Sequence, residues 1–335
     1  MKKKTTFILM AFVISLVTLT SCSDDDNNTA NPAPETNTIA DFVAANADYS
    51  SLGAALGRAG LTSVLDGTTE YTVFAPNNAA FDAFLQANNY VNLDAVPVDV
   101  LTQVLLNHVV NGNNTSDDLV TGYVQTLAVE ASTENRLNMY INVDNGVVIN
   151  GGMMNGGATV STANVPVDNG VIHAVNSVIN IPTVVTFAVA DEATFSSLVA
   201  ALTREESFPF VSTLTGTEAP SPFTVFAPTN QAFANLLTEG VLPSSVTTLA
   251  DIPTATLEAT LNTHVIAGAN VLASTLMDDM TVDNTLGANF TINVTTDGAT
   301  FTDLNGRTGN IIVTNVQAGN GVIHAIDKVI LPNLN

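Results

Sequence analysis

The sequence predicts an α+β protein built from two tandem copies of one domain. Residues 72–76 (TVFAP) recur at 224–228, and residues 169–174 (NGVIHA) recur at 320–325, at offsets of 152 and 151. A unit of about 150 residues is the size of a self-sufficient domain and far exceeds a solenoid repeat. Helical patterns precede strand patterns within each copy, which favours an α+β domain over alternating βαβ units.

The spacing between the copies locates an insertion in the second one. The offset is 146 at Ser51 and Ser197 but 152 at Thr72 and Thr224, so the second copy holds about six additional residues within 208–221. Glycine and proline in this stretch predict a surface loop, where insertions are tolerated.

Each copy begins with helical signals. Thr38 and Asp41 have the spacing of a capping box, with Asp in the place usually taken by Glu. Ile39, Phe42 and Val43 follow at helical spacing. A second helix is expected from Ser50 or Ser51, with Leu52, Ala55 and Leu56 on its apolar face.

A buried strand and two further helices follow. The β-branched and aromatic stretch 72–74 predicts a strand that ends at Pro76. Asn77, and Thr229 in the second copy, are good N-cap residues for the next helix. That helix presents Phe81, Phe84 and Leu85 (Phe233, Leu236 and Leu237 in the second copy) on one face, and another helix is expected over 98–107.

The second half of each copy predicts strands. Residues 140–143 and 146–149 flank Asp144-Asn145, which indicates a hairpin, and residues 171–175 form a closing apolar strand. Asp144-Asn145-Gly146, Asp297-Gly298 and residues 303–306 (DLNG) are expected to be turns. The last of these resembles part of a calcium loop, but Phe301 and Ile312 would occupy positions one and twelve, and neither is a ligand.

The N-terminal segment predicts export and lipid attachment. Lys2, Lys3 and Lys4 precede an apolar run over 7–19, which has about the length of the hydrophobic region of a signal peptide and is too short for a comfortable membrane span. Residues 19–22 (LTSC) resemble the lipobox of bacterial lipoproteins, in which the cysteine is acylated. Cys22 is the only cysteine in the chain. We therefore expect a signal peptide over 1–21 and lipidation at Cys22; the alternative is an ordinary cleaved signal with an incidental cysteine.

A tether over 22–36 follows the anchor. Asp24, Asp25 and Asp26 open a Thr/Asn/Ala/Pro stretch without apolar periodicity, which is typical of a flexible linker. The acidic run resembles the surface-export signal of Bacteroidetes-type lipoproteins and favours a lipid-anchored protein displayed on the outer membrane. A solvated linker with incidental charge is the alternative. The domains are expected to span 37–182 and 183–335, with a junction so short that the pair moves as a semi-rigid unit.

Charge excludes several classes of partner. Without the three signal lysines, five basic residues remain against 31 acidic ones, a net charge near −26. Binding phosphates requires a Lys/Arg footprint, so nucleic acid and anionic headgroups are excluded as primary ligands.

The two repeated phrases identify a family resemblance. Residues 72–81 (TVFAPNNAAF) and 224–233 (TVFAPTNQAF) resemble the first conserved block of the fasciclin (FAS1) family, and residues 169–175 and 320–332 resemble its second. The resemblance covers nearly all of 37–335 and implies a β-sandwich or wedge packed with helices, in extracellular proteins that mediate adhesion. It places the family's central Tyr-His pair at Asn107-His108 and Thr263-His264. The tyrosine is absent from both, which implies a partner different from that of animal members.

The four histidines occupy matched positions: His108, His173, His264 and His324. A functional interpretation would make them metal ligands or acid-base couples. No Cys, His or Glu stands at ligand spacing, so we expect structural histidines whose ring nitrogens bind nearby backbone, with no metal site and no cofactor.

Three functions follow from these observations. The first is a surface-displayed adhesion protein that binds cells, matrix or polysaccharide; its partners would be an extracellular protein or polysaccharide. The second is an accessory lipoprotein that binds a glycan or small ligand without catalysis. The third, an enzyme, lacks support, because the chain contains no nucleophile elbow, phosphate-binding loop or zinc-protease motif. We therefore predict a non-enzyme without catalytic residues, and the sequence leaves its oligomeric state open.

Overall fold

The structure is a computed structural model that describes residues 37–282, 289–296 and 298–334. Both repeats belong to one compact unit, Thr36–Asn335. The predicted signal peptide, Cys22 and the tether lie outside the described residues, as does Asp297 of one predicted turn.

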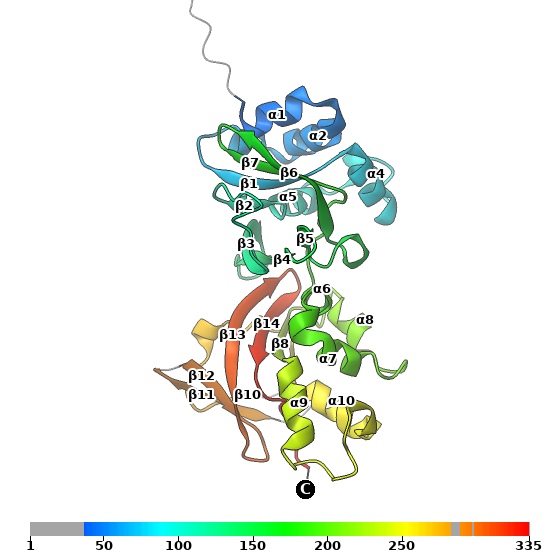
Figure 1. Ribbon diagram of the computed structural model, residues 1–335, viewed down its shortest axis with the longest axis vertical. Coiled ribbons are helices and arrows are strands. Elements are labelled where there is room, and N and C mark those ends of the chain that lie inside the picture. The colour runs from blue at the N-terminus through cyan, green and yellow to red at the C-terminus, as the bar shows by residue number, and fades with distance from the viewer. Residues whose placement is uncertain (1–36, 283–288, 297, 335) are drawn as a thin grey trace, which may run out of the picture. The chain divides into compact units, whose positions relative to one another are not determined.

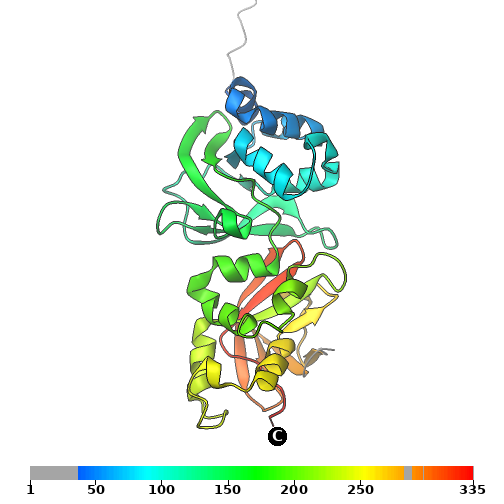
Figure 2. The ribbon, with the colours of Figure 1, turned by 90° about the vertical axis from the view of Figure 1, so that its right-hand side faces the viewer.

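The helical half of the first repeat forms as the sequence predicts. Figure 2 shows these helices, in blue to cyan, gathered on one side of the repeat. The predicted helices are α1 (Ile39–Ala45), α2 (Ser50–Ala59), α4 (Asn78–Ala87) and α5 (Val98–Leu106), and the short α3 (Thr62–Leu65) was not predicted. The capping box is confirmed: the Asp41 amide donates to Thr38 Oγ1 (3.1 Å), and the Thr38 amide donates to the Asp41 carboxylate (3.0 Å).

The strands of the first repeat close into a barrel. They are β1 (Tyr71–Pro76), β2 (Val109–Asn111), β3 (Gly122–Val129), β4 (Arg136–Asn142), β5 (Val148–Ile149), β6 (Ala158–Val167) and β7 (Gly170–Val175). β1 pairs with β7 in parallel, and the other neighbours are antiparallel.

The predicted hairpin exists, but its turn is longer than expected. Ile141 pairs with Ile149 and Asn142 with Val148, which leaves residues 143–147 as the connection in place of a two-residue turn. The Asp144 amide donates to Asn142 Oδ1 (3.0 Å), so a hydrogen bond to a side chain within the loop takes the place of the next backbone pair of the hairpin.

The second repeat follows the same order of helices. They are α6 (Val184–Ala190), α7 (Glu192–Leu202), α8 (Phe210–Leu214), α9 (Asn230–Thr238) and α10 (Thr254–Thr263). The predicted N-caps are confirmed in both repeats, since Asn77 accepts from the Ala80 amide (2.9 Å) and Thr229 from the Ala232 amide (3.2 Å).

The described strands of the second repeat form one sheet in the order β10-β11-β12-β13-β14-β8-β9. Figure 1 shows β13, β14 and β8 between the helices on one side and β11 and β12 on the other. The bounds are β8 (Phe223–Pro228), β9 (Val265–Ala267), β10 (Met280–Val282), β11 (Phe290–Thr295), β12 (Gly298–Thr302), β13 (Thr308–Ala318) and β14 (Gly321–Ile326). The predicted DLNG turn joins β12 to β13.

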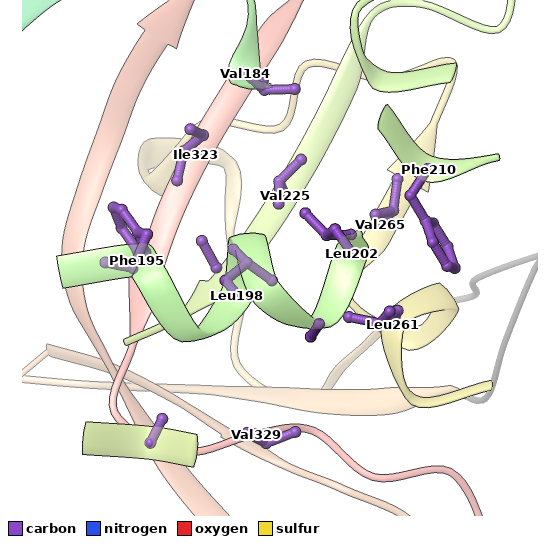
Figure 3. Packing of buried hydrophobic residues seen from close by; sticks show 14 of the residues in the cluster. Val184, Phe195, Leu198, Leu202, Phe210, Val225, Leu261, Val265, Ile323 and Val329 are labelled. Atoms are coloured by element: carbon purple, nitrogen blue, oxygen red, sulfur yellow. The ribbon is translucent and has the colours of Figure 1, made fainter. Parts of the chain in front are cut away.

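Each repeat has two cores, one between helices and sheet and one between the two halves of the strand layer. Phe81 and Phe233 lie in the helix-side cores, and Phe74 and Phe226 lie in the strand-side cores. Figure 3 shows Phe195, Leu198 and Leu202 of α7 directed toward Val225 and Ile323 of the sheet. The α+β prediction with helices packed on strands is therefore confirmed.

The glycine of the repeated Asn-Gly phrase permits the parallel strand pair. A Cβ atom on Gly170 would lie 1.9 Å from the Tyr71 carbonyl oxygen, and one on Gly321 would lie 2.2 Å from the Phe223 carbonyl oxygen. Their φ angles of 141° and 155° also disfavour a side chain. The close approach of β7 to β1, and of β14 to β8, therefore requires glycine.

The prediction of a surface loop over 208–221 is wrong in part. Asn169 binds the carbonyls of Leu65 and Gly67, and Asn320 binds those of Leu214 and Gly216, so Leu65 corresponds to Leu214 at an offset of 149. Since the offset is 146 before this point and 152 after it, about three residues are added before Leu214 and about three after Gly216. The first addition leads into α8, where Phe210 and Leu214 are buried. Burial of these two side chains against the helix-side core makes part of the predicted loop helical, and α8 takes the place that α3 has in the first repeat.

Candidate functional site

His108 and His264 connect the end of a helix to the closing segment of their repeat. His108 Nδ1–H donates to the Val104 carbonyl (2.7 Å), and its Nε2 accepts from the Ile179 amide (2.8 Å). His264 makes the same pair of bonds, to the Thr260 carbonyl (2.7 Å) and from the Ile330 amide (3.0 Å). Both rings are therefore neutral, with the proton on Nδ1.

Burial keeps these two rings neutral well below the usual range. Desolvation lowers the pKa of His108 and of His264 to about 4, against a smaller opposing effect of the backbone hydrogen bond. With both nitrogens bound to backbone, neither ring has an atom left for a metal or a proton transfer.

His173 and His324 lie in the parallel strands and bind the loop beside them. Nε2–H of His173 donates to the Asn114 carbonyl (3.0 Å), and Nε2–H of His324 donates to the Val271 carbonyl (2.8 Å). Each ring stacks on the phenylalanine of the neighbouring strand, Phe74 or Phe226, with centroids 5.4 Å apart. Burial lowers the pKa of both imidazoles. Each of the four rings thus binds backbone, as the structural interpretation expects.

The positions that align with the family's Tyr-His pair are closed to a partner. Asn107 and Thr263 are fully buried, and each donates to a carbonyl of the closing segment: Asn180 (3.0 Å) and Ile330 (3.1 Å), respectively. These side chains hold the helix against that segment and offer no surface for adhesion.

Asn169 and Asn320 anchor the start of each repeat. Oδ1 of Asn169 accepts from the Ile39 amide (2.8 Å), and its Nδ2 donates to the carbonyls of Leu65 (2.8 Å) and Gly67 (2.7 Å). Asn320 makes the same three bonds, to Val184 (3.0 Å), Leu214 (2.8 Å) and Gly216 (2.8 Å). The asparagine of the repeated phrase is therefore required by the fold.

The Asp-rich turn at 303–306 is a structural turn. Asp303 is buried, accepts from the amides of Asn305 (2.9 Å) and Arg307 (3.0 Å), and forms an ion pair with Arg307 (2.9 Å). Gly306 alone of the Asn-Gly pair has a positive φ, 73°. Over the described ranges, no group of three His, Cys, Asp or Glu residues could hold a metal ion.

Two tyrosines of the first repeat meet one carboxylate of the second. Tyr123 and Tyr140 donate to the Asp191 carboxylate at 3.2 and 3.3 Å, and Tyr123 packs edge-on against Phe187. Burial and the neighbouring negative charge raise the pKa of Tyr140 to about 12. No sequence pattern indicates these contacts, because the two tyrosines lie far from Asp191 in the chain and all three residues belong to no repeated phrase.

Matched shallow pockets lie on the helical face of both repeats. The first, of about 240 Å³, is lined by Ser51, Phe81 and Leu85; the second, of about 200 Å³, is lined by their counterparts Ser197, Phe233 and Leu237. Their floors are core side chains that both copies keep, so these hollows follow from the shared fold.

A larger pocket of about 480 Å³ lies beside α8 in the second repeat, and we refer to it as the α8 pocket. Most of its lining is apolar, and both added segments contribute to it. The hydrogen bond from the Gly268 amide to the Pro220 carbonyl (2.7 Å) fastens the second added segment to the end of β9. Phe210 lies beside Val265 and Leu202 in Figure 3. The lining residues are Pro209, Phe210, Thr213, Leu214, Pro220, Phe223, Glu258, Asn262, Val265 and Ala267.

A model of the fasciclin domain matches residues 47–182 and again residues 193–332. The chain belongs to the fasciclin (FAS1) family. The two matches cover both repeats, so the expectation of tandem FAS1 domains is confirmed.

Some relatives match a region the size of one repeat, and others match most of the chain. The uncharacterized protein sll1735 of Synechocystis sp. is 39% identical over 151 residues, which is 45% of this chain and 98% of that protein. Homo sapiens periostin is 27% identical over 282 residues, which is 82% of this chain and 30% of periostin. A region the size of one repeat thus accounts for nearly all of the bacterial relative, and both repeats together match under a third of periostin.

Among solved structures, the FAS1 domain pair from the insect cell adhesion molecule fasciclin I is 19% identical to this chain. The match covers 86% of this chain and 95% of the insect pair, with a TM-score of 0.48.

Within the described residues, no single helix has the length and hydropathy needed to cross a membrane. α6 and α7 pass that criterion only when taken together as a pair bent by 118°. Phe187, Phe195 and Leu198 of this pair are buried in the core.

Proposed function

We propose that the chain is a lipid-anchored, surface-displayed adhesion protein that binds cells, matrix or polysaccharide through its FAS1 domains. The observation that carries the proposal is the fasciclin match in both repeats. The acidic composition adds that the partner is an extracellular protein or polysaccharide and not a nucleic acid.

The anchor and the location belong to the same proposal. Acylation at Cys22 would attach the chain to the outer membrane, and the acidic tether would display residues 37–335 on the cell surface. Two tests address this part. Globomycin should block processing of the signal segment, and protease added to intact cells should remove the protein; resistance to protease in intact but not in lysed cells would contradict surface display.

We propose no catalytic activity. Each repeated histidine is bound to backbone and held neutral by burial, which removes the strongest candidates for acid-base chemistry. This is consistent with a protein whose exposed faces do the binding.

The adhesive role is tested by comparing a strain that lacks this chain with its parent. Attachment to other cells, matrix and polysaccharide should fall in the deletion strain and return when the gene is restored. Restoration with Cys22→Ser should return the protein but not attachment, since the soluble form would leave the surface. Unchanged attachment to all three substrates in the deletion strain would refute the proposal.

An accessory lipoprotein that binds a small ligand is the second candidate. The α8 pocket favours it, because a mostly apolar pocket of about 480 Å³ is within the size range of small-molecule sites. A glycan is the less suitable ligand, since the chain has no tryptophan and only five tyrosines to stack on sugar rings.

A further inference from the structure

The α8 pocket combines core side chains with residues that only the second repeat has. Pro209 and Pro220 belong to the segments that the second repeat adds. Across the aligned helices α5 and α10, whose offset is 156, Glu258 corresponds to Thr102 and Asn262 to Leu106. The first repeat folds with a threonine and a leucine at these two positions, so the shared fold does not require the Glu258 carboxylate.

The apolar wall of the pocket is rigid. Phe210 and Phe223 are 6% and 1% exposed, and both belong to the helix-side core of their repeat. Leu214 and Val265 are buried beside them. Since these side chains are held by packing on their inner side, the pocket offers a preformed surface for an apolar group.

The charge at the mouth selects the sign of the ligand. Glu258 is exposed and is the only charged residue among those that line the pocket, and Asn262 lies one turn further along the same face of α10. A carboxylate at the edge of an apolar pocket attracts a cation and repels an anion. The formal net charge of −23 acts in the same direction.

We propose that the α8 pocket is a binding site for a small organic cation with an apolar body, such as an arylalkylammonium. The apolar body contacts Pro209, Phe210 and Pro220, and the ammonium group lies beside the Glu258 carboxylate. The proposal stands on the pocket alone and does not depend on the adhesive role.

Three probes of one shape separate the apolar contribution from the charge: phenylbutylammonium, phenylbutanol and phenylbutyrate. Each is titrated into the mature chain lacking Cys22 and followed by the amide signals of residues around the pocket. Because an ion pair with an exposed carboxylate contributes little, the cation should bind about twofold to fivefold more tightly than the alcohol. The anion should bind most weakly.

Two variants and one control complete the test. Glu258→Gln should abolish the preference for the cation and leave the affinity for the alcohol unchanged. Thr213→Trp, at an exposed lining position, should fill the pocket and weaken all three probes. Asp99→Asn, which removes an exposed carboxylate on the aligned helix α5, should change nothing.

Each other result overturns the proposal. Absence of saturable shifts at the solubility limit of the probes, or shifts centred outside the pocket, would exclude the site. Equal affinity for cation and alcohol in the unaltered chain, or a cation preference that survives Glu258→Gln, would exclude the assigned role of the carboxylate.

Discussion

Replacing Asn169 by alanine tests whether the repeated Asn-Gly phrase serves the fold. The substitution removes three hydrogen bonds, of 2.8, 2.8 and 2.7 Å, from a side chain that is 3% exposed. Water can still reach the half-buried Gly67 carbonyl, but the Ile39 amide and the Leu65 carbonyl are left without a partner in the interior. Each unsatisfied buried group costs about 1–3 kcal/mol, so the free energy of unfolding should fall by about 2–6 kcal/mol.

Urea unfolding followed by circular dichroism measures this loss. Asn320→Ala should produce a loss of similar size, because Asn320 makes the same three bonds and is 1% exposed. Asn88→Ala is the control: Asn88 is exposed and makes one local bond, to the Phe84 carbonyl (2.9 Å), so its effect should stay within about 0.5 kcal/mol. If Asn169→Ala and Asn320→Ala are as mild as the control, the assignment of this phrase to the fold is refuted.

Four further predictions follow. His108 and His264 bind a proton below pH 6.5 when unfolded but only below about pH 4 when folded. Lowering the pH from 7 to 5 should therefore reduce the free energy of unfolding by about 2 kcal/mol for each histidine. His108→Gln should reduce this pH dependence in urea titrations, and an unchanged dependence would contradict the prediction. Gly170→Ala should destabilise the protein by several kcal/mol or prevent folding, because the new Cβ would meet the Tyr71 carbonyl. Gly57→Ala, in open space on α2, should be neutral or stabilising by up to about 1 kcal/mol. Thermal melts that rank the two variants alike would refute the packing argument. Replacing both Tyr123 and Tyr140 by phenylalanine should loosen the contact between the repeats and broaden the distance distribution in small-angle scattering; a distribution that is already broad in the unaltered chain would contradict the semi-rigid pair. Cys22→Ser should shift the protein from the membrane fraction to the soluble one, and retention at the membrane would exclude the lipid anchor.

Local signals in the sequence predicted the parts of the fold that depend on neighbouring residues. The Thr38 capping box, the Asn77 and Thr229 caps and the strand that ends at Pro76 are all set within a few residues, and all are confirmed. Because the domain is duplicated, each of these patterns occurs twice in the chain. It showed that His108 and His264 serve something common to both copies, and the shared backbone contacts identify what that is.

Features that depend on distant partners were beyond the sequence. Proline and glycine around α8 indicated a loop, but burial of Phe210 and Leu214 against the core made part of it helical. The meeting of Tyr123 and Tyr140 with Asp191 depends on how strands β3 and β4 fold back toward the second repeat. Glu258 was indistinguishable from any other exposed acid until the fold placed it at the mouth of the α8 pocket.

The adhesive function is tested most directly by beads that carry the protein through Cys22. As the only cysteine, Cys22 allows coupling in the orientation that the lipid anchor would impose. Beads coated with residues 22–335 should attach to cells, matrix or polysaccharide well above beads coated with the urea-unfolded chain. Equal attachment of the two kinds of bead to all three surfaces would contradict an adhesion protein that acts through folded FAS1 domains.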